Sequence, residues 1–106
     1  MIQNISVSQS FDKRKQNSDI PLIDVRTPAE YGSIHADRAV NHPMESLQVE
    51  KIPFSKEQEI HVICQSGGRS VKVSHKLEVA GFTNVANVEG GTSAWHEAGL
   101  PVVERK

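Results

Sequence analysis

The sequence predicts an α/β domain in which a mainly parallel β-sheet is covered on both faces by helices. Short apolar runs alternate along the chain with segments of helical periodicity, the pattern of strand–helix–strand units. The 106 residues contain no internal repeat and no low-complexity linker, so we expect a single domain over residues 1–106. The single cysteine permits no internal disulfide, so the domain depends on a buried apolar core.

Four apolar runs are expected to be strands, because each is short, apolar and bounded by proline, glycine or asparagine. Strands that are joined through helices run parallel, so their carboxyl ends meet at one edge of the sheet. Ligands of such open sheets sit beyond that edge. The predicted strands cover residues 20–25, 38–41, 59–64 and 84–88.

Three segments between these strands predict helices. Thr27 can cap the first, with Pro28 at the first helical position and Glu30 completing a capping box. A shorter apolar pattern predicts a helix over residues 44–49. The clearest pattern covers residues 70–80, where apolar side chains share one face and a glycine follows as a stop.

Composition and charge argue against several classes of function. Twelve basic and thirteen acidic side chains give a formal net charge of −1, so no strong field marks a nucleic-acid or membrane binder. The one basic cluster, Lys13-Arg14-Lys15, is typical of a solvated helix face. No stretch approaches the roughly 20 apolar residues of a membrane span. We expect a soluble cytoplasmic monomer without nucleic-acid or membrane partners.

The histidines give no indication of a metal site. They show no ligand-like spacing with one another or with the cysteine, so we expect neither a metal nor another cofactor. The five histidines are His35, His42, His61, His75 and His96.

The only cysteine, Cys64, lies between a predicted strand and a predicted helix, followed by a glycine pair and Arg69. Glycines let the backbone curl so that successive amides converge on one point, and the following helix adds partial positive charge. Both features and the arginine favour a thiolate that faces outward as a nucleophile. The alternative is a small buried cysteine at a strand end.

The pattern Cys-x-x-Gly-x-Arg, with Cys64, Gly67 and Arg69 in the matching places, resembles the active-site loop of the rhodanese-like sulfurtransferases. Residues 22–31 resemble the family's strand and helix before the site, and residues 88–102 resemble its closing segment. The resemblance implies a rhodanese-like α/β fold with a central sheet of about five strands.

One stretch departs from the family pattern. The family usually reads Gly-His-Ile-x-Gly-Ala-x-Asn, and residues 34–41 of this chain keep the histidine, alanine and asparagine. Ile34 and Arg38 replace the two glycines. The departure bears on the geometry of the local turn and on the surface that a partner would read there.

The resemblance implies a sulfurtransferase in which the Cys64 thiolate takes sulfane sulfur from a small donor such as thiosulfate. A thiol, cyanide or a protein acceptor would then remove the sulfur from the Cys64 persulfide. Amides of the loop would stabilise the persulfide and the departing anion. The candidate persulfide-binding loop is Gln65, Ser66, Gly67, Gly68, Arg69 and Ser70.

Several side chains have two readings at the sequence level. Arg69 either binds the donor with its planar fork or braces the loop against a carboxylate such as Asp24 or Glu30. Asp24 and Arg26 are expected to support the site, with a structural ion pair or a turn hydrogen bond favoured.

The serines and glycines near the site are also open to two readings. Ser66 and Ser70 could donate hydroxyls to the persulfide, but Ser70 is equally suited to cap the following helix. Gly90 and Gly91 are expected to allow close backbone approach, and Trp95 is expected in the core.

Two other functions use the same cysteine. A cysteine-arginine phosphatase or arsenate reductase has a similar cradle, but those phosphatases place one residue more between cysteine and arginine than the four found here. A sulfur carrier or redox-sensing module would accept persulfide from a partner and pass it on. The sequence barely distinguishes this module from a free-standing sulfurtransferase.

Overall fold

The computed structural model describes residues 2–105 and has the expected α/β fold. Five strands form one sheet in the order β1-β6-β5-β2-β4, and every pairing in it is parallel. A separate antiparallel pair joins β3 and β7. The strands are β1 Gln3–Ile5, β2 Leu22–Asp24, β3 Ile34–Ala36, β4 Val40–Asn41, β5 Ile60–Ile63, β6 Val85–Val88 and β7 Val102–Glu104.

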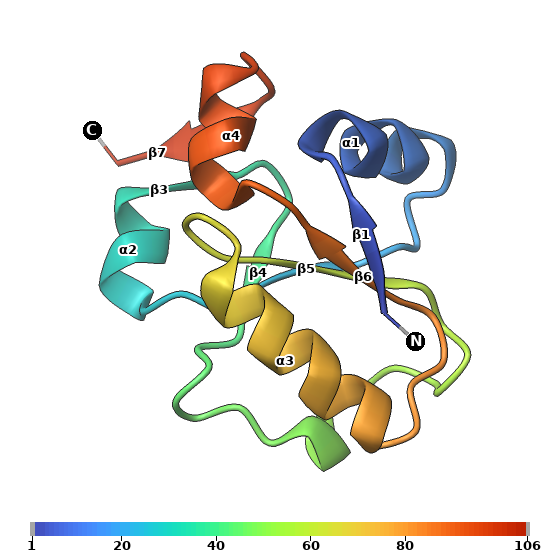
Figure 1. Cartoon of the computed structure of the whole chain (residues 1–106). Coiled ribbons are helices and arrows are strands. Elements are labelled where there is room, and N and C mark those ends of the chain that lie inside the picture. The colour runs from blue at the N-terminus through green and yellow to red at the C-terminus, as the bar shows by residue number, and fades with distance from the viewer. Residues whose placement is uncertain (1, 106) are drawn as a thin grey trace.

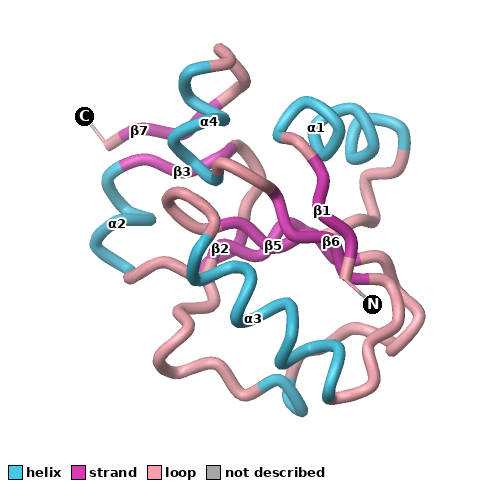
Figure 2. The backbone as a smooth tube through the Cα atoms, in the orientation of Figure 1, coloured by secondary structure: helices cyan, strands magenta, loops and turns pink. Residues whose placement is uncertain are grey.

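Helices cover both faces of the sheet (Figure 1). Helix α3 packs on one face, and α1 and α4 pack on the other, with α2 beside the β3–β7 pair (Figure 2). Thr27 and Glu30 form the expected capping box at the start of α2. The helices are α1 Val7–Gln16, α2 Pro28–Ser33, α3 Gly68–Val79 and α4 Gly91–Glu97, with a short 3-10 helix η1 at Val49–Lys51.

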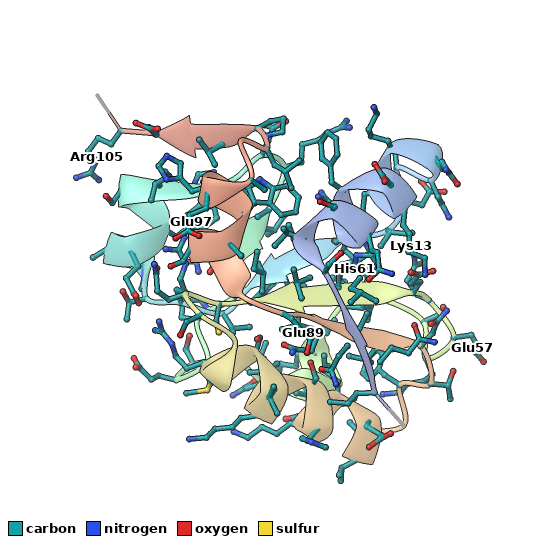
Figure 3. All side chains as sticks on the ribbon, turned by 45° about the horizontal axis from the view of Figure 1, so that its top comes forward. Lys13, Glu57, His61, Glu89, Glu97 and Arg105 are labelled. Atoms are coloured by element: carbon teal, nitrogen blue, oxygen red, sulfur yellow. The ribbon has the colours of Figure 1, made fainter. Side chains whose placement is uncertain are left out.

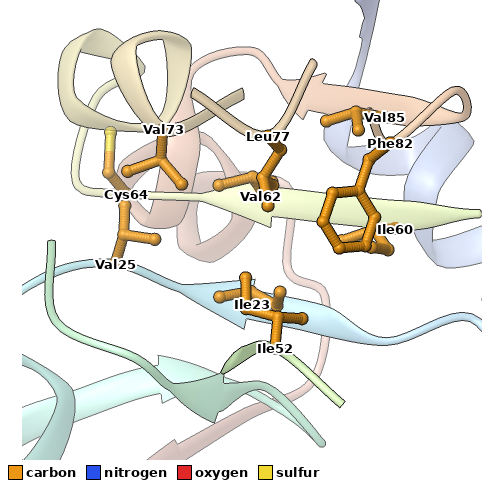
Figure 4. Packing of buried hydrophobic residues seen from close by; sticks show 10 residues of the cluster. All are labelled: Ile23, Val25, Ile52, Ile60, Val62, Cys64, Val73, Leu77, Phe82 and Val85. Atoms are coloured by element: carbon orange, nitrogen blue, oxygen red, sulfur yellow. The ribbon is translucent and has the colours of Figure 1, made fainter. Parts of the chain in front are cut away.

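The strands supply two cores because successive side chains point to opposite faces. Ile23 and Val62 face α3, whereas their neighbours Leu22 and Ile63 face α1 and α4. Figure 4 shows the cluster on the α3 face, which includes the Cys64 side chain. Trp95 is fully buried in the other cluster, as expected.

The helix predicted over residues 44–49 is wrong. The chain there forms turns that lead into η1. The Met44 amide donates to the Val25 carbonyl, so the backbone is tied to the end of β2 instead of forming its own helical ladder. Met44, Leu47 and Val49 still pack against the core from this irregular segment.

Three strands were not expected from the sequence, namely β1, β3 and β7. Each has only three residues, and each carries at least one half-buried or exposed position. Such short segments have no measurable periodicity of their own. Pairing with β6, or of β3 with β7, decides their conformation.

At residues 34–41, where the sequence departs from the family pattern, the chain forms β3 and a turn in which the Ala39 amide donates to the Ala36 carbonyl at 3.0 Å. Ile34 adopts an extended backbone in β3, paired with Glu104 of β7, which needs no glycine. Arg38 has a φ of +68° and is the only non-glycine residue with positive φ among residues 2–105. The arginine therefore adopts the left-handed conformation that favours glycine.

A buried hydrogen-bond network ties α1 to β5. The Ser10 hydroxyl lies 2.7 Å from Nδ1 of His61, and Nε2 of His61 lies 2.8 Å from a Glu59 carboxylate oxygen. The Lys13 ammonium, on the next turn of α1, pairs with the same Glu59 oxygen at 2.9 Å. Figure 3 shows His61 on the α1 side of the sheet, below Lys13. Ser10 and His61 are fully buried.

Candidate active site

The loop that follows β5 carries the cysteine to the carboxyl edge of the sheet. Cys64 directly follows the last residue of β5, and α3 begins at Gly68. Gly67 is the N-cap of α3 with a φ of +116°, a conformation that other residues avoid. This turn folds the loop back over the sulfur, and the Gly67 amide donates to Cys64 Sγ at 3.1 Å.

Hydrogen bonds make the Cys64 sulfur more acidic than a free thiol. Burial by itself raises the pKa of Cys64. Hydrogen bonds from the Ser70 hydroxyl and from the amides of Ser70, Gly67 and Ser66 outweigh that burial, so the pKa lies below its usual value. The loop therefore favours the thiolate, the form of cysteine that acts as a nucleophile.

The Cys64 side chain does not face outward as the sequence suggested. Only 1% of the residue is exposed, and it packs in the α3-side core near Val25 and Val73 (Figure 4). The reason is that Cys64 continues the alternation of β5, in which Val62 points to the same face. The sulfur combines both sequence readings, because it is buried and also surrounded by hydrogen-bond donors.

Ser70 is not the cap of α3, because the N-cap is Gly67 and Ser70 lies inside the first turn. The Cys64 thiol donates to the Ser70 side-chain oxygen at 3.3 Å, and the Ser70 hydroxyl donates to the Asn87 side-chain oxygen. Once Cys64 is ionised, the Ser70 hydroxyl becomes a donor to the sulfur, which lowers the pKa of Cys64. Asn87 in turn donates to the Asn4 side-chain oxygen at 3.1 Å. A chain of polar groups thus runs from the sulfur through β6 to the neighbourhood of β1.

Sequence reasoning missed Asn87, although a signal was available. An asparagine inside the apolar run of β6 is unusual, because a buried amide needs a hydrogen-bond partner. Asn87 is only 2% exposed. A buried asparagine in the strand next to β5, which leads into the cysteine loop, could have been predicted to face a polar group of the candidate site.

Asp24 and Arg26 form the expected buried ion pair. The Arg26 guanidinium donates to both oxygens of the Asp24 carboxylate, with its Nη2 2.9 Å from Oδ2. Nη1 of Arg26 donates to the Gln65 side-chain oxygen at 3.0 Å, and Nη2 also donates to the Ile34 carbonyl. The pair therefore contacts the loop through Gln65 and does not contact the sulfur in any hydrogen bond of the described residues.

Arg69 pairs with Glu30 of α2. Its two terminal nitrogens lie 2.7 and 3.0 Å from the two carboxylate oxygens, a bidentate arrangement. The hydrogen bond from Arg69 lowers the pKa of Glu30 to about 2, well below its usual 4.5. Both side chains are about one-third exposed. The Arg69 guanidinium, at the end of the cysteine loop, is therefore held by the Glu30 carboxylate.

The start of α4 holds the loop from the other side. The amides of Thr92 and Ser93 donate to the carbonyls of Cys64 and Gln65 at 2.8 and 3.1 Å. A Cβ atom on Gly91 would lie within 2.6 Å of the Gln65 carbonyl group, which confirms the expected close backbone approach. Thr92 is a further site residue that the sequence did not reveal, since it acts through its backbone amide and its hydroxyl.

Within residues 2–105, His, Cys, Asp and Glu side chains nowhere gather in a group of three or more that could hold a metal ion. None of the helices in the same residues has the length and apolar character needed to span a bilayer.

A parallel five-stranded sheet, flanking helices and a cysteine loop at the carboxyl edge define the class of the protein. The chain belongs to the family of rhodanese-like domains, whose model matches residues 7–98. A sulfurtransferase of Allochromatium vinosum is 30% identical over 97% of this chain and 96% of its own length. Thiosulfate sulfurtransferase 16 of the Arabidopsis thaliana chloroplast is 41% identical over 74% of this chain and 76% of its own length.

The length of the relatives varies. The chain spans 58% of an uncharacterized protein of Synechocystis sp., to which it is 31% identical. Among solved structures, a rhodanese-related protein of Thermoplasma volcanium matches with a TM-score of 0.84 and 28% identity, covering 97% of this chain and 99% of that one. The polysulfide-sulfur transferase of Wolinella succinogenes matches with a TM-score of 0.81 and 30% identity, covering 99% of this chain and 80% of that one.

Proposed function

We propose that the protein transfers sulfane sulfur from thiosulfate to a thiophilic acceptor through a persulfide on Cys64. The thiolate attacks the outer sulfur of thiosulfate, a new S–S bond forms, and sulfite leaves with the electron pair of the bond that breaks. Cyanide or a thiolate then attacks the outer sulfur of the persulfide and restores the Cys64 thiolate. No net oxidation occurs, because sulfur moves between two nucleophiles.

The observation that carries this proposal is the set of donors around the Cys64 sulfur. The Gly67 amide and the Ser70 hydroxyl both contact Sγ, and they lower the pKa of the thiol despite its burial. Donors that are fixed by the fold stabilise negative charge on sulfur at no cost of reorganisation. The name of the Arabidopsis relative supports thiosulfate as the donor, and the name of the Wolinella neighbour makes polysulfide the alternative.

The test is a mass measurement on the purified chain. Incubation with thiosulfate is expected to add the mass of one sulfur atom, and cyanide is expected to remove it with formation of thiocyanate. Cys64→Ser is expected to show neither the adduct nor turnover, because it removes the only thiol. An adduct on Cys64→Ser would overturn the proposal.

A sulfur-carrier role is distinguished by turnover. A free-standing sulfurtransferase is expected to produce many equivalents of thiocyanate per chain at steady state. A carrier is expected to take up one sulfur and then turn over small donors poorly. Comparing thiosulfate with polysulfide in the same assay separates the two donors.

A further inference from the structure

A pocket of about 410 Å³ opens on the edge of the sheet opposite to Cys64. Its walls come from α1, the residues that lead into β2, the turn between β3 and β4, and the region of α4 and the segment that follows it. Since β2 and β5 run parallel, the amino end of β2 and the carboxyl end of β5 lie at opposite edges. The pocket is therefore separate from the sulfur-transfer loop.

Positive charge is in excess in this pocket. Its lining includes three cationic side chains, Arg14, Lys15 and Arg38, and a single carboxylate, Asp37. No ion pair of residues 2–105 joins any of the three cations to a carboxylate. Burial lowers the pKa of Arg14, and the charge of Arg38 lowers it further, while Asp37 acts in the opposite direction. An anion placed between these cations would relieve their mutual repulsion.

Arg38 occupies this position against a conformational preference. Its φ of +68° is strained for a residue with a Cβ atom, and glycine would relieve the strain. Strained residues persist where the surroundings hold them, and they concentrate at binding and active sites. The strained backbone places an arginine in the lining of the pocket, where glycine would contribute no side chain.

The remaining walls are apolar and aromatic apart from Ser18. Phe11 and Trp95 meet edge to face with ring centroids 6.0 Å apart, and both residues line the pocket, Trp95 from a fully buried position. The Lys15 ammonium lies 5.3 Å from the Phe11 ring centroid, so charge and aromatic surface are adjacent. Pockets that bind small molecules typically combine a mostly apolar wall with a few placed polar groups.

We propose that this pocket binds a small organic anion whose carboxylate, sulfonate or phosphate group pairs with Arg14 and Arg38. The body of the ligand, aromatic or aliphatic, lies against the Phe11 side of the pocket. A guanidinium fork matches each of these oxyanions. An organic anion also gains contact with the apolar wall, so we expect it to bind more tightly than an inorganic anion. Binding here does not involve Cys64 and does not depend on the proposed sulfur transfer.

Trp95 is the only tryptophan of the chain, which makes its indole a single-site reporter. Its Nε1–H donates to the Pro101 carbonyl at 2.7 Å, and both residues line the pocket. The probe is naphthalene-1-sulfonate, followed by the NMR shift of the Trp95 indole N–H. The neutral probe 1-naphthalenemethanol and sodium sulfate, at matched ionic strength, separate the apolar and anionic contributions.

The sulfonate is expected to bind about tenfold or more tightly than the neutral alcohol, and more tightly than sulfate, because charged hydrogen bonds are added to apolar contact. Arg38→Gly is expected to weaken sulfonate binding about tenfold while the fold persists, since glycine suits the positive φ. Arg14→Gln is expected to act in the same direction. Lys76→Gln, which removes an exposed charge from α3, is expected to leave binding unchanged.

Three results would overturn the proposal. One is equal affinity for the sulfonate and the neutral alcohol. Another is an Arg38→Gly variant that binds as well as Lys76→Gln. The third is sulfonate binding that shifts resonances of the Cys64 loop and leaves the Trp95 indole unmoved.

Discussion

At the scale of single residues, the proposed sulfur transfer depends on the hydrogen bonds that the buried Cys64 sulfur receives. Burial disfavours a thiolate, and hydrogen-bond donors favour it. The Cys64 sulfur has both a hydroxyl and backbone amides as partners, and the balance lowers its pKa. The two kinds of donor can be separated by mutation, because only the hydroxyl belongs to a side chain.

Removing the Ser70 hydroxyl is expected to make Cys64 less acidic. In Ser70→Ala the amides remain, but the hydroxyl that lies 3.3 Å from the sulfur is lost. Loss of a hydrogen bond that favours the charged form is expected to raise the pKa of Cys64, so the alkylation midpoint moves to higher pH. The measurement is the rate of thiol alkylation against pH.

Ser66→Ala is the matched control for this prediction. The exposed Ser66 contributes a backbone amide to the sulfur, which alanine retains. The alkylation midpoint is expected to stay at the wild-type value. A midpoint for Ser70→Ala that equals the control would show that the amides alone set the acidity of Cys64.

The residues of the loop were predictable, whereas their partners were not. Cys64, Gly67 and Arg69 are adjacent in sequence and form a recognisable pattern. Asn87 and Thr92 lie far along the chain, and only the packing of β6 and α4 against the loop brings them to Ser70 and to the Cys64 carbonyl.

At the scale of elements, an ion pair between α2 and α3 holds the end of the cysteine loop. The bidentate contact of Arg69 with Glu30 supports a bracing role for the arginine. Both partners are about one-third exposed, so solvent screens the pair and its contribution to stability is expected to be at most about 1 kcal/mol.

Breaking this pair from either side is expected to have the same small effect. Arg69→Ala and Glu30→Gln should each lower the melting temperature slightly and leave the KM for thiosulfate nearly unchanged. Glutamine is chosen because it can still accept the capping hydrogen bond from the Thr27 amide. Thermal unfolding and steady-state kinetics provide the two readouts.

A change in the KM for thiosulfate, instead of in the melting temperature, would show that Arg69 binds the sulfur donor. In that case Arg69→Ala raises the KM for thiosulfate, whereas Glu30→Gln frees the guanidinium and lowers the KM. Arg69→Lys would recover part of the loss, because an ammonium keeps the charge and lacks the planar fork.

The network between α1 and β5 predicts a pH dependence of stability. Burial lowers the pKa of His61 below its usual 6.5, and this outweighs the opposing effect of Glu59, so His61 binds a proton less readily in the folded protein than in the unfolded chain. Between the two pKa values the unfolded chain binds more protons than the folded chain, so the stability that neutral His61 contributes is present above pH 6.5 and is lost as the pH falls. The loss is confined to the pH range between the usual pKa of histidine and the lower pKa of His61 in the folded protein.

Urea unfolding at pH 7.5 and pH 5.5 measures this dependence. His61→Gln, which cannot titrate, is expected to be less stable at pH 7.5 and to show a smaller change between the two values. His75→Gln, at a side chain that is 60% exposed, is expected to keep the wild-type change. If both variants change equally with pH, then His61 does not control the acid sensitivity of the fold.

At the scale of the whole molecule, the topology brings the chemistry to one edge. All five strands of the main sheet are parallel, so the ends of β2 and β5 place Asp24, Arg26 and Cys64 together. The loop between Cys64 and Arg69 is short, with four intervening residues. Its ring of amides suits one sulfur better than a tetrahedral phosphoryl group.

The short loop predicts an absence of phosphatase activity. The wild-type chain is expected to show no measurable hydrolysis of an aryl phosphate, because the ring cannot surround three equatorial oxygens. Inserting a glycine after Gly67 is expected to weaken sulfur transfer by moving the Gly67 amide away from the sulfur. Phosphatase activity in the wild type that disappears in Cys64→Ser would replace the sulfurtransferase proposal.

The sequence by itself determined the α/β class, the central strands, the capping of α2 and the cysteine loop. These features depend on local signals: apolar runs, a capping box, and glycines next to a cysteine. The helix expected over residues 44–49 failed for the complementary reason. The Met44 amide donates to the Val25 carbonyl just after β2, in place of a hydrogen bond within a helix. The sequence of residues 44–49 alone does not predict this long-range hydrogen bond.

Only the tertiary structure decided where the sulfur lies and what surrounds it. The alternation of β5 turns Cys64 into the core, and α3 then supplies the Ser70 hydroxyl that contacts the sulfur. The Asn87 side chain of β6 accepts from that hydroxyl, and Thr92 of α4 donates to the Cys64 carbonyl. The cationic pocket likewise forms from α1, the β3–β4 turn and the region of α4, which are distant along the chain. Contacts between distant segments depend on how the elements pack together. Such packing leaves no periodic pattern in the sequence from which it could be predicted.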